Sequence, residues 1–428
     1  MNTPPGRLRG SPRARGALEA LNFSMADMQA GIGPFLGVFL QGKGWATGAI
    51  GSVMTIGGIA GMLMTAPAGA LIDATRHKRW YVIVSGIFTV IASSLIWFSQ
   101  ATWVVALSQV ATAIAGAAIG PAVAGITLGI VRQQGFNRQN GRNQAWNHAG
   151  NMVGAGLSGF LGWKFGFGAV FVLAALFGVL AITSVLLIPE KEIDHQAARG
   201  LEKGGDGDGD GHGDGDAGGK AEGLRMLLRN KPLLILAASL ACFHLGNGAL
   251  LPLYTLAVAT THGNPAIFAA EMIVIAQAVM IVAAIFGTRM AEAQGYWLVI
   301  FATFLILPVR GLIASYFITS WGVFPVQVLD GVAAGLQSVA VPGLVARILA
   351  GTGRVNVGQG AVMTVQGVGA SLSPAIGGWI VQYLGYHVAF LILGGFALGS
   401  VALWLGAASI LKPACAGRPD AALRPVAA

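Results

Sequence analysis

Twelve stretches of mainly apolar residues run through this sequence, and each is long enough to cross a lipid bilayer as a helix. A spanning helix needs roughly 20 such residues. Only 10% of the 428 residues are charged, whereas soluble proteins carry about 25%, which excludes a water-facing shell. The sequence therefore predicts an all-α integral membrane protein with twelve transmembrane helices. The stretches lie at 17–41, 46–72, 80–99, 102–131, 143–164, 167–188, 233–259, 266–289, 296–317, 321–347, 356–382 and 386–411.

The twelve stretches divide into two groups of six that look alike. Gly166 and Gly385 are 219 positions apart, and Pro34 and Pro252 are 218 apart. One nearly constant offset is what a duplicated six-helix unit would leave. We therefore expect two pseudo-symmetric six-helix bundles joined by a polar linker rich in Asp and Gly. The expected segments are a tail at 1–16, a bundle at 17–188, the linker at 189–232, a bundle at 233–411 and a tail at 412–428.

The positions of Lys and Arg predict the orientation of the chain. With the amino terminus in the cytoplasm, 23 of the 26 Lys and Arg residues lie in cytoplasmic segments or at helix ends. Lys43 and Lys164 fall outside, and Arg310 lies within a span. Cytoplasmic loops of membrane proteins are enriched in these residues. We expect a multi-pass protein of the inner (cytoplasmic) membrane with both termini in the cytoplasm.

The loop between the second and third stretches resembles the signature of the major facilitator superfamily. In that signature a Gly is followed four residues later by Asp and then by basic residues, which matches Gly69, Asp73, His77 and Lys78, although Arg76 stands where the family has a second Gly. The resemblance implies two bundles that rock around a midplane cavity lined by spans one, four, seven and ten. It also implies that Gly69, Asp73 and Lys78 form a conformational latch, while the alternative is a basic loop that only orients the chain.

A second resemblance concerns the direction of transport. Antiporters of this superfamily often carry a Gly-rich run with Pro in span five. Here the run Gly369–Gly378 with Pro374 lies in span eleven, and span five has Ala155 where the Pro would fall. Thr112 replaces the Arg that many proton-coupled drug antiporters carry in span four. The run favours export, and the two departures weaken the match to a standard drug–proton antiporter.

Three ionisable residues stand out well inside predicted spans, where a charge at the helix centre costs about 2.5–3.5 kcal/mol on insertion scales. Asp27 lies in the middle of span one without a basic neighbour in sequence. We expect it to couple transport to protons or to bind a cationic substrate; the alternative is a structural acid. Arg310 and Asp330 lie ten residues on either side of Ser320, so an antiparallel hairpin places them at the same depth. They are predicted to form a structural charge pair, and Asp330 alternatively exchanges Arg310 for a proton or substrate.

Polar side chains on spans five, seven and eleven predict a cavity rich in hydrogen-bonding groups. Asn143, Asn147 and Asn151 share one helix face at intervals of four residues, and such a face must contact protein or water. His148 lies beside it and is a candidate for proton coupling or substrate binding, although a histidine in such a position is equally well explained as a structural group. The residues expected to line the cavity are Gln29, Asn147, Asn151, His244, Asn247 and Gln366.

Together these features predict a secondary transporter that exports a small organic solute in exchange for protons by alternating access. The alternatives are a proton-coupled importer of a polar metabolite or small anion, and a non-transporting sensor or lipid-handling protein on the same fold. The sequence lacks a phosphate-binding loop and the motifs of metalloproteases and serine hydrolases, so we expect no enzyme activity and no cofactor or metal. The expected partners are the solute, protons and the bilayer, with no nucleic acid, and the protein is expected to be a monomer.

Overall fold

The computed structural model describes residues 10–30, 33–199, 228–261, 264–350 and 355–416. Within these ranges the chain is helical apart from short connections, and it forms no β-strand. The amino-terminal half contains α1 (Pro12–Ala30), α2 (Gly33–Gly42), α3 (Thr47–Ala74), α4 (Lys78–Phe98), α5 (Thr102–Phe165) and α6 (Phe167–Leu186), followed by the short 3₁₀ helices η1 (Glu190–Glu192) and η2 (Ala197–Arg199). The other half contains α8 (Lys231–Thr261), α9 (Pro265–Gln294), α10 (Tyr296–Tyr316), α11 (Val323–Ile348), α12 (Val355–Gly406) and α13 (Ala408–Cys415).

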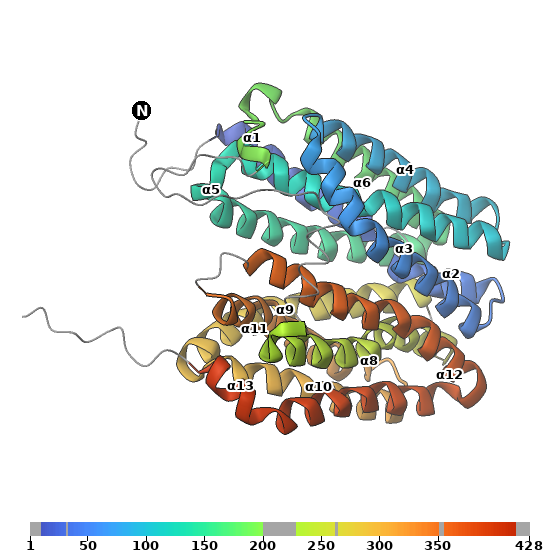
Figure 1. Cartoon of the computed structure of the whole chain (residues 1–428). Coiled ribbons are helices and arrows are strands. Elements are labelled where there is room, and N and C mark those ends of the chain that lie inside the picture. Colours follow the sequence, from blue (N-terminus) through green and yellow to red (C-terminus); the bar gives the residue numbers. More distant parts are fainter. Residues whose placement is uncertain (1–9, 31–32, 200–227, 262–263, 351–354, 417–428) are drawn as a thin grey trace, which may run out of the picture.

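These helices form two bundles that lie one above the other in Figure 1, the first drawn in blue to green and the second in yellow-green to red. Nine helices of the described residues are long and apolar enough to cross a membrane. The difference from the twelve predicted spans comes from three places. The first span is divided into α1 and α2, α12 contains two spans, and the polar second half of α5 lies beyond the apolar segment that ends at Arg132.

Glycines with positive φ connect successive spans without a loop. Gly166 joins α5 to α6 with φ 79° and ψ 174°, and Gly385 divides α12 with φ 82° and ψ 169°. This backbone conformation is open to glycine because it has no Cβ. These are the two glycines that the sequence places 219 positions apart, so the duplication is visible in the backbone as well as in the sequence.

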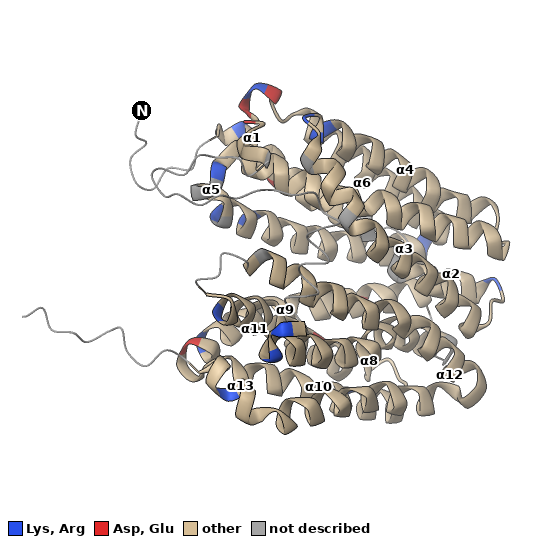
Figure 2. Ribbon diagram, viewed as in Figure 1, with Lys and Arg blue, Asp and Glu red and all other residues tan. Residues whose placement is uncertain are grey.

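The outer surface of both bundles is apolar, as a bilayer requires. Phe88, Val172 and Phe286 each expose 60% or more of their area, and large apolar patches of this kind mark surfaces that water does not cover in the native setting. Lys and Arg residues instead gather toward one end of both bundles, in the left half of Figure 2. This end, where α1 begins and α6 ends, is called the α1 end below.

The two bundles contact each other closely at the end opposite to the α1 end. A Cβ atom on Gly51 of α3 would lie 2.0 Å from the backbone oxygen of Pro374 in α12, and one on Gly162 of α5 would lie 2.7 Å from the Cβ of Ala266 in α9. Small residues let helix backbones approach in lipid, where packing replaces the hydrophobic effect. Gly51 lies in the first turns of α3 and Gly162 in the last turn of α5, which places this tight interface near one membrane surface.

The linker predicted at 189–232 lies partly outside the described residues, which stop at 199 and resume at 228. Its limits therefore remain a prediction. Beyond the second bundle, α13 begins within the range predicted for the bundle and ends within the range predicted for the carboxyl-terminal tail. Leu411 and Cys415 of α13 are buried against the second bundle.

Candidate functional site

A buried cluster of charged and amide groups connects α8, α10 and α11 in the second bundle. Arg310 Nη1 lies 2.5 Å from Asp330 Oδ1 and donates a hydrogen bond of 2.6 Å to Asn247 Oδ1. The Arg310 side chain is 1% exposed, whereas Asp330 is 15% exposed. The structure thus brings together three of the residues that the sequence singles out, at the depth expected from the hairpin count.

Within the described part of the chain, Asp330 is the one carboxylate that pairs with the guanidinium of Arg310. Its Nε donates to the backbone oxygen of Val326 at 3.0 Å, and its Nη2 is buried without a hydrogen-bond partner among the described residues. Because a guanidinium stays charged, neutralising Asp330 would leave a buried cation without a counter-ion. Asp330 is the more exposed member of the pair.

A chain of polar side chains runs beside this cluster between the same three helices. His244 Nε2 lies 3.2 Å from Gln337 Oε1, and Gln337 Nε2 lies 3.5 Å from Thr303 Oγ1. Buried polar groups in a membrane protein need such partners because lipid offers none. His244 is thus a hydrogen-bonded member of the second bundle.

His148 contributes a polar contact between the two bundles. Its Nδ1 lies 2.9 Å from Gln277 Oε1 of α9. Both residues are partly buried, and the contact lies closer to the middle of α5 than the pair Gly162 and Ala266. The contact therefore joins α5 of the first bundle to α9 of the second.

The amide face of span five is used in two ways. Asn147 Nδ2 donates to the backbone oxygen of Asn22 in α1 at 3.3 Å, and Asn151 Nδ2 donates to Asn147 Oδ1 at 3.3 Å. Asn143 instead turns to Thr127 Oγ1 within the first part of α5, at 3.1 Å. The bond from Asn147 therefore holds α1 against α5, and the other two amides bond within α5. Gln366 is half-buried on α12.

The sequence analysis missed an ion pair inside the first bundle. Glu19 of α1 is 8% exposed, and its Oε1 and Oε2 lie 2.9 Å and 3.2 Å from Nε and Nη2 of Arg142 in α5. Gln139 Nε2 reaches Glu19 Oε1 at 3.3 Å. The signal was present, because Glu19 lies within the predicted span 17–41. What hid the pairing is the separation of 123 residues between the two partners.

The residues of the predicted latch lie at the α1 end. Lys78 is 2% exposed, and its Nζ donates to the backbone oxygens of Ile72 at 2.5 Å and Thr75 at 3.4 Å. A cation at these carbonyls is stabilised by the dipole of α3. Gly69 lies in α3. The side chain of Asp73 lies outside the described residues, as do those of Asp27 and Gln29.

The segment after α6 is fastened to the α1 end by three acidic residues. Asp194 Oδ2 lies 2.7 Å from Arg132 Nη2, Glu190 lies 3.4 Å from Arg79, and both Glu192 oxygens accept hydrogen bonds from Ser11. The backbone amide of Ala197 is the largest cause of a lowered pKa at Asp194; the amide of Gln196 and the charge of Arg132 act in the same direction. Arg132 itself has φ 55° between the two spans of α5, which is uncommon for a residue other than glycine.

Comparison with known protein families identifies the family to which this chain belongs. The family model of the Major Facilitator Superfamily matches residues 18–324 and 236–426. The chain belongs to the major facilitator superfamily. Two uncharacterised MFS-type transporters from two strains of Mycobacterium tuberculosis are each 37% identical to it over 398 residues, covering 92% of this chain and 93% of each relative. The match confirms the resemblance seen in the loop 69–78. The members of this superfamily are transporters.

Solved structures of MFS proteins show the same fold at low identity. A variant of the nucleoside transporter NupG is 14% identical with a TM-score of 0.76, covering 92% of this chain and 99% of that one. A bacterial homologue of the human lysosomal transporter Spinster, in an inward-facing and unoccupied conformation, is 14% identical with a TM-score of 0.70, covering 96% and 100%. The prediction of an all-α membrane protein built as two six-helix bundles is therefore confirmed.

Proposed function

We propose that this MFS transporter exports a small organic solute in exchange for protons by alternating access, from an inner membrane in which both termini are cytoplasmic. The observation that carries the proposal is the pair of Arg310 and Asp330 at 2.5 Å, with the arginine fully buried and the carboxylate partly exposed. An intramembrane charge pair is costly, and such residues usually mark an ion or substrate pathway.

Asp330 is the central proton-binding residue in this proposal, together with Asp27 of α1. A proton on Asp330 removes the negative charge with which Arg310 is now paired, and leaves the guanidinium its hydrogen bond to Asn247 Oδ1. A cationic or neutral solute competes with protons for the same carboxylate, so protonation on one side of the membrane releases the solute there. Each binding event stabilises one orientation of the bundles only through its difference in affinity for the two states.

Export is favoured by the position of the Gly/Pro run on α12. Gly378 and Pro374 of this run approach Thr47 and Gly51 of α3 across the bundle interface, and Ala375 N donates to Thr55 Oγ1 at 2.9 Å. In antiporters that this chain resembles, a similar run is a feature of the exporting type. The Lys and Arg side chains at the α1 end (Figure 2) support a cytoplasmic position for that end.

The test is proton flux in proteoliposomes that contain a trapped pH-sensitive dye. Cationic, neutral and anionic solutes are added to the wild-type protein and to the variants Asp330→Asn and Asp27→Asn, with Glu292→Gln as a matched control on an exposed acid of α9. We expect a cationic or neutral solute to drive proton movement in the wild type and the control but in neither variant. Solute movement without proton flux, or equal flux in all four proteins, would refute the coupling.

A second candidate function is uptake of a small anion or polar metabolite with protons. This function is favoured by the buried Nη2 of Arg310, which has no hydrogen-bond partner among the described residues. An oxygen atom of an anionic solute would accept the hydrogen bond that this nitrogen can donate. In the same assay this function predicts that anionic solutes alone cause proton flux, and that flux is in the direction of the solute. Export predicts opposite directions, so the sign of the pH change separates the two candidates.

A further inference from the structure

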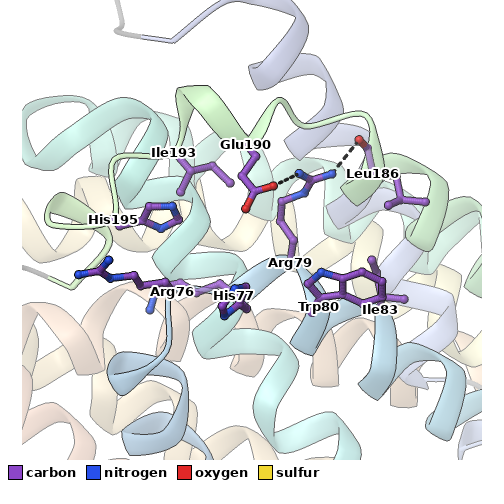
Figure 3. Close-up of a pocket in the computed structure, with 10 residues that line it drawn as sticks. Arg76, His77, Arg79, Trp80, Ile83, Leu186, Glu190, Ile193 and His195 are labelled. Carbon is purple, nitrogen blue, oxygen red and sulfur yellow. Dashed lines mark hydrogen bonds and ion pairs between the residues drawn. The ribbon is translucent and has the colours of Figure 1, made fainter.

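A pocket of about 170 Å³ lies at the α1 end of the first bundle, away from the charge cluster of the second bundle. It is formed where the amino terminus of α4 meets the segment that follows α6, as Figure 3 shows. Six of its residues carry the argument, namely Arg76, His77, Arg79, Trp80, Glu190 and His195. Nothing in the proposed transport cycle uses this pocket.

The charges of the pocket favour an anion. Arg79 is already engaged, because its Nη2 donates to the Leu186 oxygen at 3.0 Å and its Nη1 lies 3.4 Å from Glu190. Arg76 makes no hydrogen bond or ion pair with any described residue, and it is exposed on the turn before α4. Figure 3 shows Arg76 on the same side of the pocket as His195. One free guanidinium thus faces a pocket whose single acid is already paired.

Two features at one side of the pocket favour an anion. The Nδ1 atom of His195 is buried without a hydrogen-bond partner among the described residues. A buried donor or acceptor left unpaired is costly, so this ring nitrogen points to a ligand that can pair with it. The first turn of α4, a helix of 21 residues, begins after His77 without a side-chain cap, and the dipole of this helix favours negative charge at its amino terminus.

The surroundings of the pocket point to a lipid as the source of that anion. Trp80 and Leu186 line the pocket and are 62% and 54% exposed, and tryptophan is enriched at the level of lipid headgroups. A volume of about 170 Å³ accommodates a phosphate group. A free phosphate would gain nothing from the apolar flank, whereas acyl chains would lie against it.

We infer that this pocket binds the phosphate group of an anionic phospholipid. Arg76 supplies the charge, the dipole of α4 stabilises the anion at its amino terminus, the side chain of His195 supplies a hydrogen bond, and Trp80 with Leu186 contacts the glycerol and acyl chains. The lipid would bridge the turn before α4 and the segment after α6, and would thereby strengthen the attachment that the Arg79–Glu190 pair makes. Basic pockets at this level of other membrane proteins take such headgroups.

The test uses the full-length protein, purified and placed in nanodiscs of phosphatidylcholine with 10% phosphatidylglycerol. Native mass spectrometry then counts the phosphatidylglycerol molecules retained by the wild type, by Arg76→Gln, and by Arg289→Gln. Arg289 is a matched control because it is an exposed arginine in the last turns of α9 at the same end of the second bundle. Both substitutions remove one exposed positive charge, and size-exclusion profiles confirm that the variants are folded.

We expect the most tightly retained phosphatidylglycerol to fall at least threefold in Arg76→Gln and to be unchanged in Arg289→Gln. Equal losses in the two variants would show attraction by surface charge alone and would overturn the site. Adding 10 mM inorganic phosphate or glycerol 3-phosphate to the wild type separates the two sources of the phosphate group. Failure of both to displace the lipid supports the assignment, and displacement by either at this concentration would overturn the choice of a lipid. The result does not depend on which solute is transported.

Discussion

Replacing Asp330 by Asn tests the buried charge pair most directly. The variant keeps the shape of the side chain but leaves Arg310, which is 1% exposed, without its carboxylate. At an effective dielectric of about 20, two charges about 4 Å apart attract by about 4 kcal/mol. Measured losses on removing one partner of a buried pair are similar, at about 3–5 kcal/mol. We therefore expect Asp330→Asn to lower the free energy of unfolding by roughly 3–5 kcal/mol.

The double variant Arg310→Gln with Asp330→Asn is the decisive comparison. It removes both charges, so no uncompensated ion remains in the membrane, and it should be more stable than Asp330→Asn alone. Unfolding by SDS in mixed micelles, followed by circular dichroism, measures all the variants under one condition. Glu292→Gln removes an exposed acid from the same bundle and should change stability by less than about 0.5 kcal/mol.

Two results would refute this reasoning about the pair. The first is an Asp330→Asn variant within about 1 kcal/mol of the wild type, since this is well below the loss expected for a buried ion without its partner. The second is a double variant no more stable than the single one, which would show that the loss comes from the shape or hydrogen bonds of Asp330. The charge exchange Arg310→Asp with Asp330→Arg adds a further check, because simple pairing predicts that it recovers membrane insertion lost in either single variant.

Three further predictions concern other parts of the molecule. Asp194 has a lowered pKa, so its contribution to stability should be fully present above its ordinary pKa of about 3.9 and be lost as the pH falls through the lower folded value. The difference in melting temperature between wild type and Asp194→Asn should therefore shrink as the pH is lowered from 7 to below about 3.9, and a difference independent of pH would contradict this. Gly385→Ala should cost about 1–3 kcal/mol because φ is 82°, whereas Gly395→Ala, in a regular helix with open space around it, should cost nothing in the same SDS titration. Gly51→Ala would put a Cβ 2.0 Å from the Pro374 oxygen and should therefore open the tight interface, which spin-label distances across the two bundles would detect as a population shift absent from Gly395→Ala.

The first span shows where counting apolar residues stops being sufficient. The sequence predicts one helix over 17–41, and the structure has α1 ending at Ala30 and α2 beginning at Gly33. Similarly, 143–164 was predicted as a span, but among the described residues the segment of α5 that is apolar enough to cross a membrane ends at Arg132. Length and hydropathy describe the transfer of a segment from water to lipid. They do not describe breaks within a helix, which neighbouring helices stabilise by supplying hydrogen bonds.

Contacts between polar side chains on different helices were predictable only where the number of residues between them sets their relative depth in the membrane. Arg310 and Asp330 lie on adjacent antiparallel helices, so residue counting from one turn sets their relative depth. Glu19 and Arg142, and His148 and Gln277, are separated by more than 100 residues. Their contact depends on how each helix is rotated and on which helices are neighbours, and no local pattern in the sequence encodes either quantity.

The sequence by itself determined the fold class of this transporter, its internal duplication, and the concentration of Lys and Arg that indicates its orientation. These follow from the cost of placing polar groups in lipid, which acts on each segment separately. The tertiary structure alone decided which bundle end is closed, how the segment after α6 attaches to the α1 end, and which polar groups are left without partners. These depend on packing between residues far apart in the chain, where the approach of two backbones at Gly51 and Pro374 matters as much as hydropathy.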